Sequence, residues 1–194
     1  MSAEAIATGE TDPPLRPLPG RAAELPAGVD APPRLVAHLR AVHDVAARLV
    51  EWVRRRCPEL ELDAEAVLFG AATHDIGKAL HPAELSDPGA RHEEAGRELL
   101  LGHGVEPGLA RFAGTHASWT APGTGAEDLL VSLADKVWKN KRVTELEDLV
   151  VALPAGADGR AAWEWFMELD EVLTEIGDGA DRSPAYQMSH PLTR

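Results

Sequence analysis

An imidazole and a carboxylate stand side by side at His74 and Asp75, and only Thr73 separates them from an apolar run over residues 66–72. Burying both groups at the end of such a run costs free energy unless each finds a partner. A divalent metal ion satisfies a carboxylate and an imidazole together. The pair therefore favours a metal site, and a helix end with solvated polar residues is the open alternative.

Asp135 offers a second carboxylate in a similar setting. It lies in a mostly apolar helical stretch, on the same side as Val131 and Trp138. An acid on that side needs a partner, which a metal ion would provide. The alternative is a surface carboxylate paired with Lys136 or Lys139.

His43 is the candidate imidazole from a third segment. It lies on one edge of the apolar stripe of a helix predicted over residues 34–57, and His38 lies on the other edge. Either histidine could be a hydrogen-bonded core residue, so these residues alone do not choose between them. Asp44 falls on the polar side of this helix and is predicted to be solvated.

The segments that must position these residues are all predicted to be helices. Apolar residues recur at helical spacing, and no stretch alternates apolar and polar residues long enough for a sheet. We predict an all-α, compact bundle of about six to seven helices, with Asp63 as the N-cap of the second helix. The predicted spans are 34–57, 63–74, 87–101, 107–116, 127–140 and 161–176, with a further helical stretch over 145–152.

Three regions divide the chain by composition. Residues 1–33 form a Pro/Gly/Ala-rich N-terminal extension in which no regular element is expected, so it is either a tail or an ordered wrap. Residues 34–177 form a single helical domain, since 194 residues leave no need for a second one. Residues 178–194 are predicted to be an irregular C-terminal tail.

Composition limits the partners. The formal net charge of −13 argues against a nucleic-acid polymer, because phosphate backbones require clustered Lys and Arg. A small anionic substrate stays compatible if a metal supplies positive charge. The lone Cys57 suits a reducing compartment, and neither a signal peptide nor an apolar run of about 20 residues is seen. We therefore expect a soluble, cytoplasmic protein without membrane contact.

The order of these residues along the chain resembles the HD superfamily of metal-dependent phosphohydrolases. A histidine, then HDIGK at 74–78, then ADK at 134–136 lie on three predicted helices, and the resemblance covers roughly residues 34–145. It implies a helical HD-domain bundle and favours His43 over His38. His92 and His116 resemble the extra ligands of HD subfamilies with two metals, which include HD-GYP phosphodiesterases, symmetrical dinucleoside tetraphosphate hydrolases and mixed-valence diiron oxygenases.

The resemblance also implies roles for these residues. His43, His74 and Asp135 would hold one ion, His92 and His116 a second, and Asp75 would bridge the two. The expected cofactor is thus one or two divalent ions per chain, with Fe, Mn, Mg, Ni and Zn not distinguished. Asp75 and Lys78 are the expected catalytic residues, and Lys78 and Lys136 the expected contacts to a small anionic substrate. The open alternatives are a core role for His116, a helix N-terminal role for His92 and a helix-end charge for Lys78.

The leading functional prediction is hydrolysis of a small phosphate ester or anhydride, with nucleotides among the candidate substrates. The first alternative is a diiron HD-domain oxygenase acting on a small molecule, which the same ligands can support. The second is a non-catalytic metal-binding regulatory module. No GYP motif follows His92 or His116, which disfavours an HD-GYP enzyme. Homo-oligomers are compatible with all three.

Overall fold

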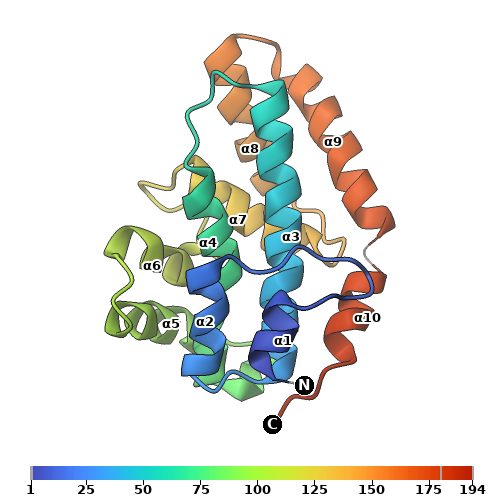
Figure 1. Ribbon diagram of the computed structural model, residues 1–194. Coiled ribbons are helices and arrows are strands. Elements are labelled where there is room, and N and C mark those ends of the chain that lie inside the picture. Colours follow the sequence, from blue (N-terminus) through green and yellow to red (C-terminus); the bar gives the residue numbers. More distant parts are fainter. Residues whose placement is uncertain (1, 180, 194) are drawn as a thin grey trace.

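The computed structural model describes residues 2–179 and 181–193, and every regular element in these ranges is a helix (Figure 1). This confirms the prediction of an all-α fold. The elements are α1 (Ala3–Thr8), α2 (Gly20–Gly28), α3 (Pro33–Arg56), α4 (Ala64–Thr73), the short 3-10 helices η1 (Ile76–Ala79) and η2 (Pro82–Leu85), α5 (Arg91–Gly102), α6 (Pro107–Thr115), α7 (Ala126–Val137), α8 (Thr144–Asp158), α9 (Ala162–Asp178) and α10 (Arg182–Met188).

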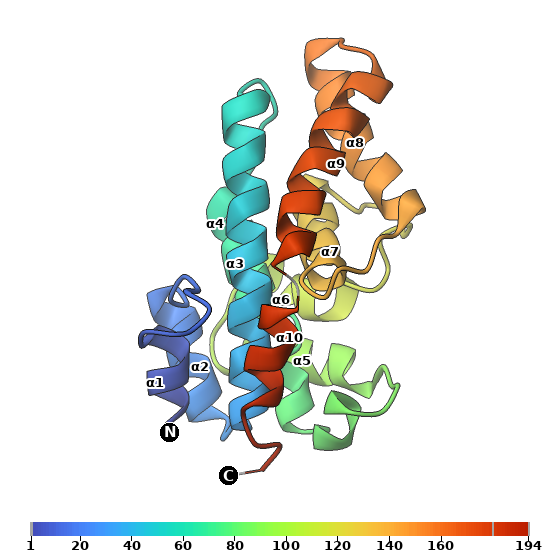
Figure 2. The ribbon, with the colours of Figure 1, turned by 90° about the vertical axis from the view of Figure 1, so that its right-hand side faces the viewer.

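The long helix α3 is the axis around which the other helices pack. Pro33 begins it, where a missing N–H costs nothing, and three arginines in its last turn complement the negative end of the helix dipole. Figure 2 shows α1 and α2 along one side of its lower half and α10 along another, with α9 beside its upper half. The predicted span of 34–57 agrees with the observed helix to within one residue.

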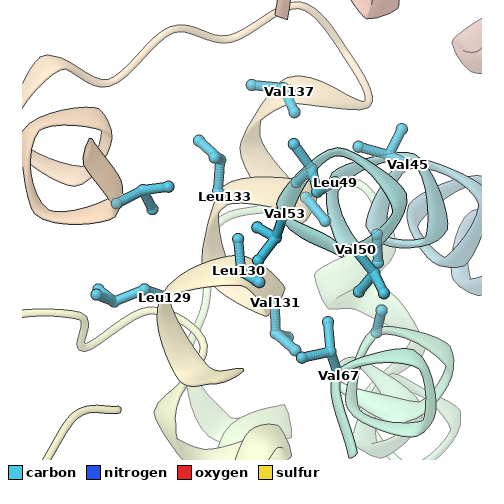
Figure 3. Close-up of a cluster of buried hydrophobic side chains, with 14 of the residues drawn as sticks. Val45, Leu49, Val50, Val53, Val67, Leu129, Leu130, Val131, Leu133 and Val137 are labelled. Atoms are coloured by element: carbon cyan, nitrogen blue, oxygen red, sulfur yellow. The ribbon is translucent and has the colours of Figure 1, made fainter. Parts of the chain in front are cut away.

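The main hydrophobic core lies where α3, α4 and α7 meet. Figure 3 shows aliphatic side chains of the three helices interlocking there. Leu49 of α3, Val67 of α4 and Leu130 of α7 are all fully buried. Burying a side chain of this size contributes about 1.5–3 kcal/mol each, so this contact fixes how the three helices sit relative to one another.

The N-terminal extension is not irregular, which corrects the prediction for residues 1–33. It forms α1 and α2, and their apolar residues, among them Ile6 and Leu25, are buried in a second hydrophobic cluster with the first part of α3. The Ser2 side chain accepts a hydrogen bond from Ala5 N and caps α1. Short helices of this kind are stabilised by tertiary packing, which proline-rich composition does not reveal.

Arg40 of α3 holds this extension in place. Its buried guanidinium donates hydrogen bonds to three backbone carbonyls, those of Ile6 (2.6 Å), Leu15 (2.7 Å) and Arg16 (3.0 Å). Burial lowers the pKa of Arg40 from its usual value, yet the three acceptors keep the charged side chain satisfied.

We expect Arg40→Met to lower the free energy of unfolding by about 3 kcal/mol, because one buried and two part-buried carbonyls lose a charged donor. Urea unfolding of the metal-free protein measures the change. Arg16→Met is the matched control, since that side chain is 40% exposed and its surface ion pairs contribute little. Equal losses in the two variants would contradict the role of Arg40.

The C-terminal tail also contains a helix, α10, where an irregular path was predicted. Tyr186 is buried in the cluster around the first part of α3. Arg34 binds the chain beyond α10, its Nε donating to His190 O (2.9 Å) and its backbone N–H to Pro191 O (3.1 Å). The described ranges contain ten α-helices where six to seven were predicted, and the additional ones are α1, α2 and α10.

The third predicted helix begins later than Asp87. Residues 82–85 form η2, and α5 starts at Arg91. The reason is a side-chain cap from outside the helix, because the Glu84 carboxylate accepts the N–H groups of Arg91 (3.2 Å) and His92 (3.1 Å). The predicted fifth helix, in contrast, starts within one residue of α7.

Within the described ranges, no helix combines the length and apolar character needed to cross a membrane.

Candidate metal centre

Four histidines and two aspartates from five helical segments meet beside the first half of α3. All six residues are buried, and none is more than 8% exposed. They are His38 of α3, His74 and Asp75 at the end of α4, His92 in the first turn of α5, His116 at the end of α6 and Asp135 of α7.

A close backbone contact brings η1, the turn that follows α4, against α5. A Cβ on Gly77 would overlap the carbonyl oxygen of His92 and lie 2.5 Å from Gly96 N. Glycine at both positions lets η1 lie directly on α5. The contact places Asp75, two residues before Gly77, against His92.

Asp75 lies at the centre of the cluster, with a different set of neighbours on each carboxylate oxygen. Its Oδ2 lies 3.0 Å from His38 Nε2 and 3.6 Å from His74 Nε2. Its Oδ1 lies 3.0 Å from His92 Nε2 and 3.5 Å from His116 Nε2. The carboxylate therefore joins two groups of imidazoles, one on each oxygen.

Asp135 completes the first group. Its Oδ1 lies 3.5 Å from His74 Nε2 and 4.0 Å from His38 Nε2. The ligand atoms of His38, His74, Asp75 and Asp135 all lie within 4.8 Å of one another, and so do those of Asp75, His92 and His116. Ligands about 2.0–2.2 Å from a common ion are separated by about 3–4 Å, so both groups have the spacing of a coordination sphere.

In three of these histidines, the ring nitrogen Nδ1, which points away from the centre of the cluster, lies beside a hydrogen-bond acceptor. Nδ1 of His74 lies 2.9 Å from Ala71 O, and Nδ1 of His116 lies 3.1 Å from Ala113 O. Nδ1 of His92 lies 2.6 Å from the Glu84 carboxylate. An acceptor at Nδ1 selects the tautomer that carries its proton there, which leaves a lone pair on Nε2 for a metal ion.

The electrostatics of the cluster favour neutral rings at His38 and His116 and ionised carboxylates at Asp75 and Asp135. Burial lowers the pKa of His38, and it lowers the pKa of His116 to about 4, with a further contribution from His74. Burial by itself raises the pKa of Asp75, but the neighbouring histidines, His74 foremost, hold it well below its usual value. These are the protonation states that metal ligands require.

The pKa values of Asp135 and His92 are each set by two opposing effects. Burial opposes ionisation of Asp135 as well, but the His74 ring, whose Nε2 lies 3.5 Å from Asp135 Oδ1, lowers the pKa of the carboxyl group. Burial lowers the pKa of His92, while its contacts with Asp75 and Glu84 outweigh this and raise it.

A metal ion fits this residue set. Nε2 of His38, His74 and His92 and Oδ1 of Asp75 are buried polar atoms without a hydrogen-bond partner among the described residues. Such atoms cost free energy unless something else satisfies them. Imidazole nitrogen and carboxylate oxygen are ligands suited to Zn, Fe, Ni or Mn.

The structure corrects one predicted ligand: His38, and not His43, lies with the other five residues. Five residues along an α-helix turn the side chain by about 140°, so the two histidines point to different sides of α3. His43 is buried elsewhere, in the field of Asp44, Arg16 and Arg40, and its Nδ1 has no partner among the described residues. The other five predicted ligands lie together as expected.

His43 is expected to make the fold acid-sensitive. Burial lowers its pKa from 6.5 to about 4, so between these values the unfolded chain binds a proton that the folded chain does not. Stability therefore falls as the pH falls through this window. We expect the wild type to lose about 2 kcal/mol more than His43→Gln between pH 7 and pH 5. Urea unfolding of both metal-free proteins at the two pH values tests this, and parallel losses would contradict it.

Lys78 and Lys136, the predicted substrate contacts, reach the same cluster. Lys78 Nζ lies 2.6 Å from Asp75 Oδ2, and Lys136 Nζ lies 2.6 Å from Asp135 Oδ2. Both lysines line a pocket of about 610 Å³ that also exposes His38, Asp75, His92, His116 and Asp135. The pocket is of the size that takes small molecules.

Two residues beside the site were missed from the sequence. Trp138 lies edge-on to His38, with 4.8 Å between the ring centroids. Glu84 contacts His92 and was not singled out, since a single glutamate in a Pro-containing loop carries no signal of its own. The only hint is its position eight residues before a candidate ligand.

The sequence model of the HD domain matches residues 35–140 of the chain, which is more than half of its length. The matched segment runs from α3 to just beyond α7 and contains all six residues of the cluster. Neither the curated proteins nor the solved structures gave a significant match to the chain.

Proposed function

Because the chain belongs to the HD-domain family, we propose that it is a metal-dependent phosphohydrolase acting on a small phosphate ester or anhydride, with nucleotides among the candidate substrates. The observation that carries the proposal is the Asp75 carboxylate, which faces two groups of histidine Nε2 atoms in a pocket lined by lysines. One carboxylate shared between two ligand groups is the arrangement of a dinuclear site.

The residues divide between two ions. His38, His74, Asp75 and Asp135 would hold the first, and Asp75, His92 and His116 the second. Divalent ions held by these residues would lower the pKa of the attacking water and would stabilise the negative charge that develops on the phosphoryl oxygens.

The chain itself binds and orients the substrate. Lys78 and Lys136 present ammonium groups on flexible stems that can turn from their carboxylate partners to a phosphate oxygen. Burial keeps His38 and His116 neutral, so they act as ligands and not as proton donors. Pro184, Gln187 and Met188 of α10 line the same pocket and would contact the part of the substrate that does not react.

Lys78→Met is expected to lower kcat/KM about 10- to 100-fold while leaving the metal content unchanged. A hydrogen bond to a charged group contributes about 1.5–3 kcal/mol, and each 1.4 kcal/mol is a factor of ten in rate. Phosphate release at saturating metal measures the change. Lys141→Met is the control, because Lys141 is exposed and does not line the pocket. Full activity of Lys78→Met would remove this residue from the site.

Elemental analysis of protein purified without chelators tests the proposed function, followed by phosphate release from a panel of nucleotides and phosphate esters. Two divalent ions per chain with phosphate release would support a dinuclear phosphohydrolase. Two irons with oxygen consumption and no phosphate release would replace it with a diiron oxygenase. Bound metal without turnover would indicate a regulatory module, and a chain that takes up no metal would overturn the proposal.

A further inference from the structure

Glu84 lies outside both groups of candidate ligands yet is joined to one of them. Its side chain is only 10% exposed, and Oε2 lies 2.6 Å from His92 Nδ1. The same oxygen accepts the backbone N–H of His92 at 3.1 Å, and Oε1 accepts the N–H of Arg91 at 3.2 Å. One carboxylate thus binds the first turn of α5 and the ring of a candidate ligand.

His92 is distinguished from the other histidines of the cluster by this partner. Nδ1 of His74 and Nδ1 of His116 face neutral backbone carbonyls. Nδ1 of His38 has no partner among the described residues. The second ligand group therefore contains an imidazole that is polarised by a full negative charge, and the first group contains none.

The backbone of Gly89 lies directly against this carboxylate. A Cβ on Gly89 would lie 2.5 Å from Glu84 Cδ and 2.5 Å from its Oε1. The loop before α5 therefore approaches Glu84 as closely as a glycine allows, and any larger residue at position 89 would push the carboxylate aside.

We propose that Glu84 is a positioning residue for the second metal site, holding the proton of His92 on Nδ1 so that Nε2 is presented to the ion beside Asp75. The proposal rests on the proposed metal-dependent function. A carboxylate behind a histidine ligand fixes the ring orientation and increases the basicity of the coordinating nitrogen. Glu84 should therefore set the affinity of the second ion, and the first ion should not depend on it.

A purely structural role is the competing explanation, since Glu84 also caps α5. Glu84→Gln separates the two, because the amide keeps an oxygen that can accept an N–H but loses the negative charge. We expect this variant to weaken binding of the second Mn²⁺ about 10-fold and Glu84→Ala to weaken it up to about 100-fold. Binding of the first Mn²⁺ and the thermal stability of Glu84→Gln should stay close to those of the wild type.

The experiment is a Mn²⁺ titration of the full chain by calorimetry, together with ¹⁵N NMR of the histidine rings in the metal-free protein. Glu94→Gln is the matched control, since Glu94 lies on α5, the helix that Glu84 caps, but is exposed and paired with Arg97. The NMR spectrum should show His92 protonated on Nδ1 in the wild type and lose that signature in Glu84→Ala. Gly89→Ala, which displaces the carboxylate without removing it, should weaken the second ion in the same way.

The outcomes separate the two proposals. Two ions bound by the wild type with unchanged affinities in Glu84→Gln, Glu84→Ala and Gly89→Ala would overturn the role of Glu84 and leave the metal site standing. Equal weakening of both ions would show a general structural effect and also overturn it. A wild type that binds no Mn²⁺, even with His92 protonated on Nδ1, would overturn the metal site and with it the role of Glu84.

Discussion

Asp75→Asn is expected to remove both metal ions and to lower kcat/KM at least about a thousandfold. The carboxylate is the single residue shared by the two ligand groups, with His38 Nε2 3.0 Å from one oxygen and His92 Nε2 3.0 Å from the other. An amide keeps the shape but supplies neither the charge nor two equivalent oxygens. Metal catalysis contributes several kcal/mol to such reactions, and about 4 kcal/mol corresponds to a thousandfold loss of rate.

Metal analysis and phosphate release of the purified variant test this expectation. Asp44→Asn is the control, because His43-Asp44 is the second His-Asp pair of the chain and lies outside the cluster. Asp44, which was predicted to be solvated, accepts hydrogen bonds from Arg16 N (3.1 Å) and Nη1 (3.0 Å). Its loss should affect stability modestly and metal binding not at all. An Asp75→Asn protein that keeps two ions would refute the shared carboxylate.

His38→Gln and His43→Gln are expected to differ strongly in metal binding and in turnover. The first should lose the ion held with His74 and Asp135, together with most of the activity, because His38 Nε2 is one of the ligand atoms that lie within 4.8 Å of one another. The second should keep both ions and near wild-type turnover. The expected difference in kcat/KM is at least about a hundredfold, corresponding to a loss of about 3 kcal/mol of transition-state stabilisation.

Calorimetric metal titration and steady-state kinetics of the two variants measure this difference. Circular dichroism confirms that both are folded, which is needed because both histidines are buried. If His43→Gln lost the metal and His38→Gln kept it, the arrangement of the cluster described above would be wrong.

The sequence was informative about the fold wherever apolar periodicity was long. α3 and α6 were predicted to within about one residue at each end, since each begins at a proline and carries a clear apolar stripe. The helices α1, α2 and α10 were missed. They have only 6, 9 and 7 residues, and they depend on contacts such as those of Arg40 that lie far away in sequence.

The site was predictable in its residue types and less so in its geometry. His74 and Asp75 stood out because polar groups at the end of an apolar helix need partners, and Asp135 stood out for the same reason. Choosing between His38 and His43 required knowing which side of α3 faces α4 and α7, and both edges of its stripe are buried because α1, α2 and α10 cover the remaining sides. Glu84 acts through a contact that no spacing rule encodes.

The helix α10 has a consequence for how proteins with this fold could diversify. It contributes Pro184, Gln187 and Met188 to the pocket, although the HD-domain match ends at residue 140 and the six clustered residues all lie before that point. The six clustered residues and the part of the pocket wall that α10 supplies are thus encoded in separate stretches of the gene. Substitutions in α10 would therefore remodel the pocket wall without altering the proposed ligand set, so new specificities would be open to variants that still bind metal.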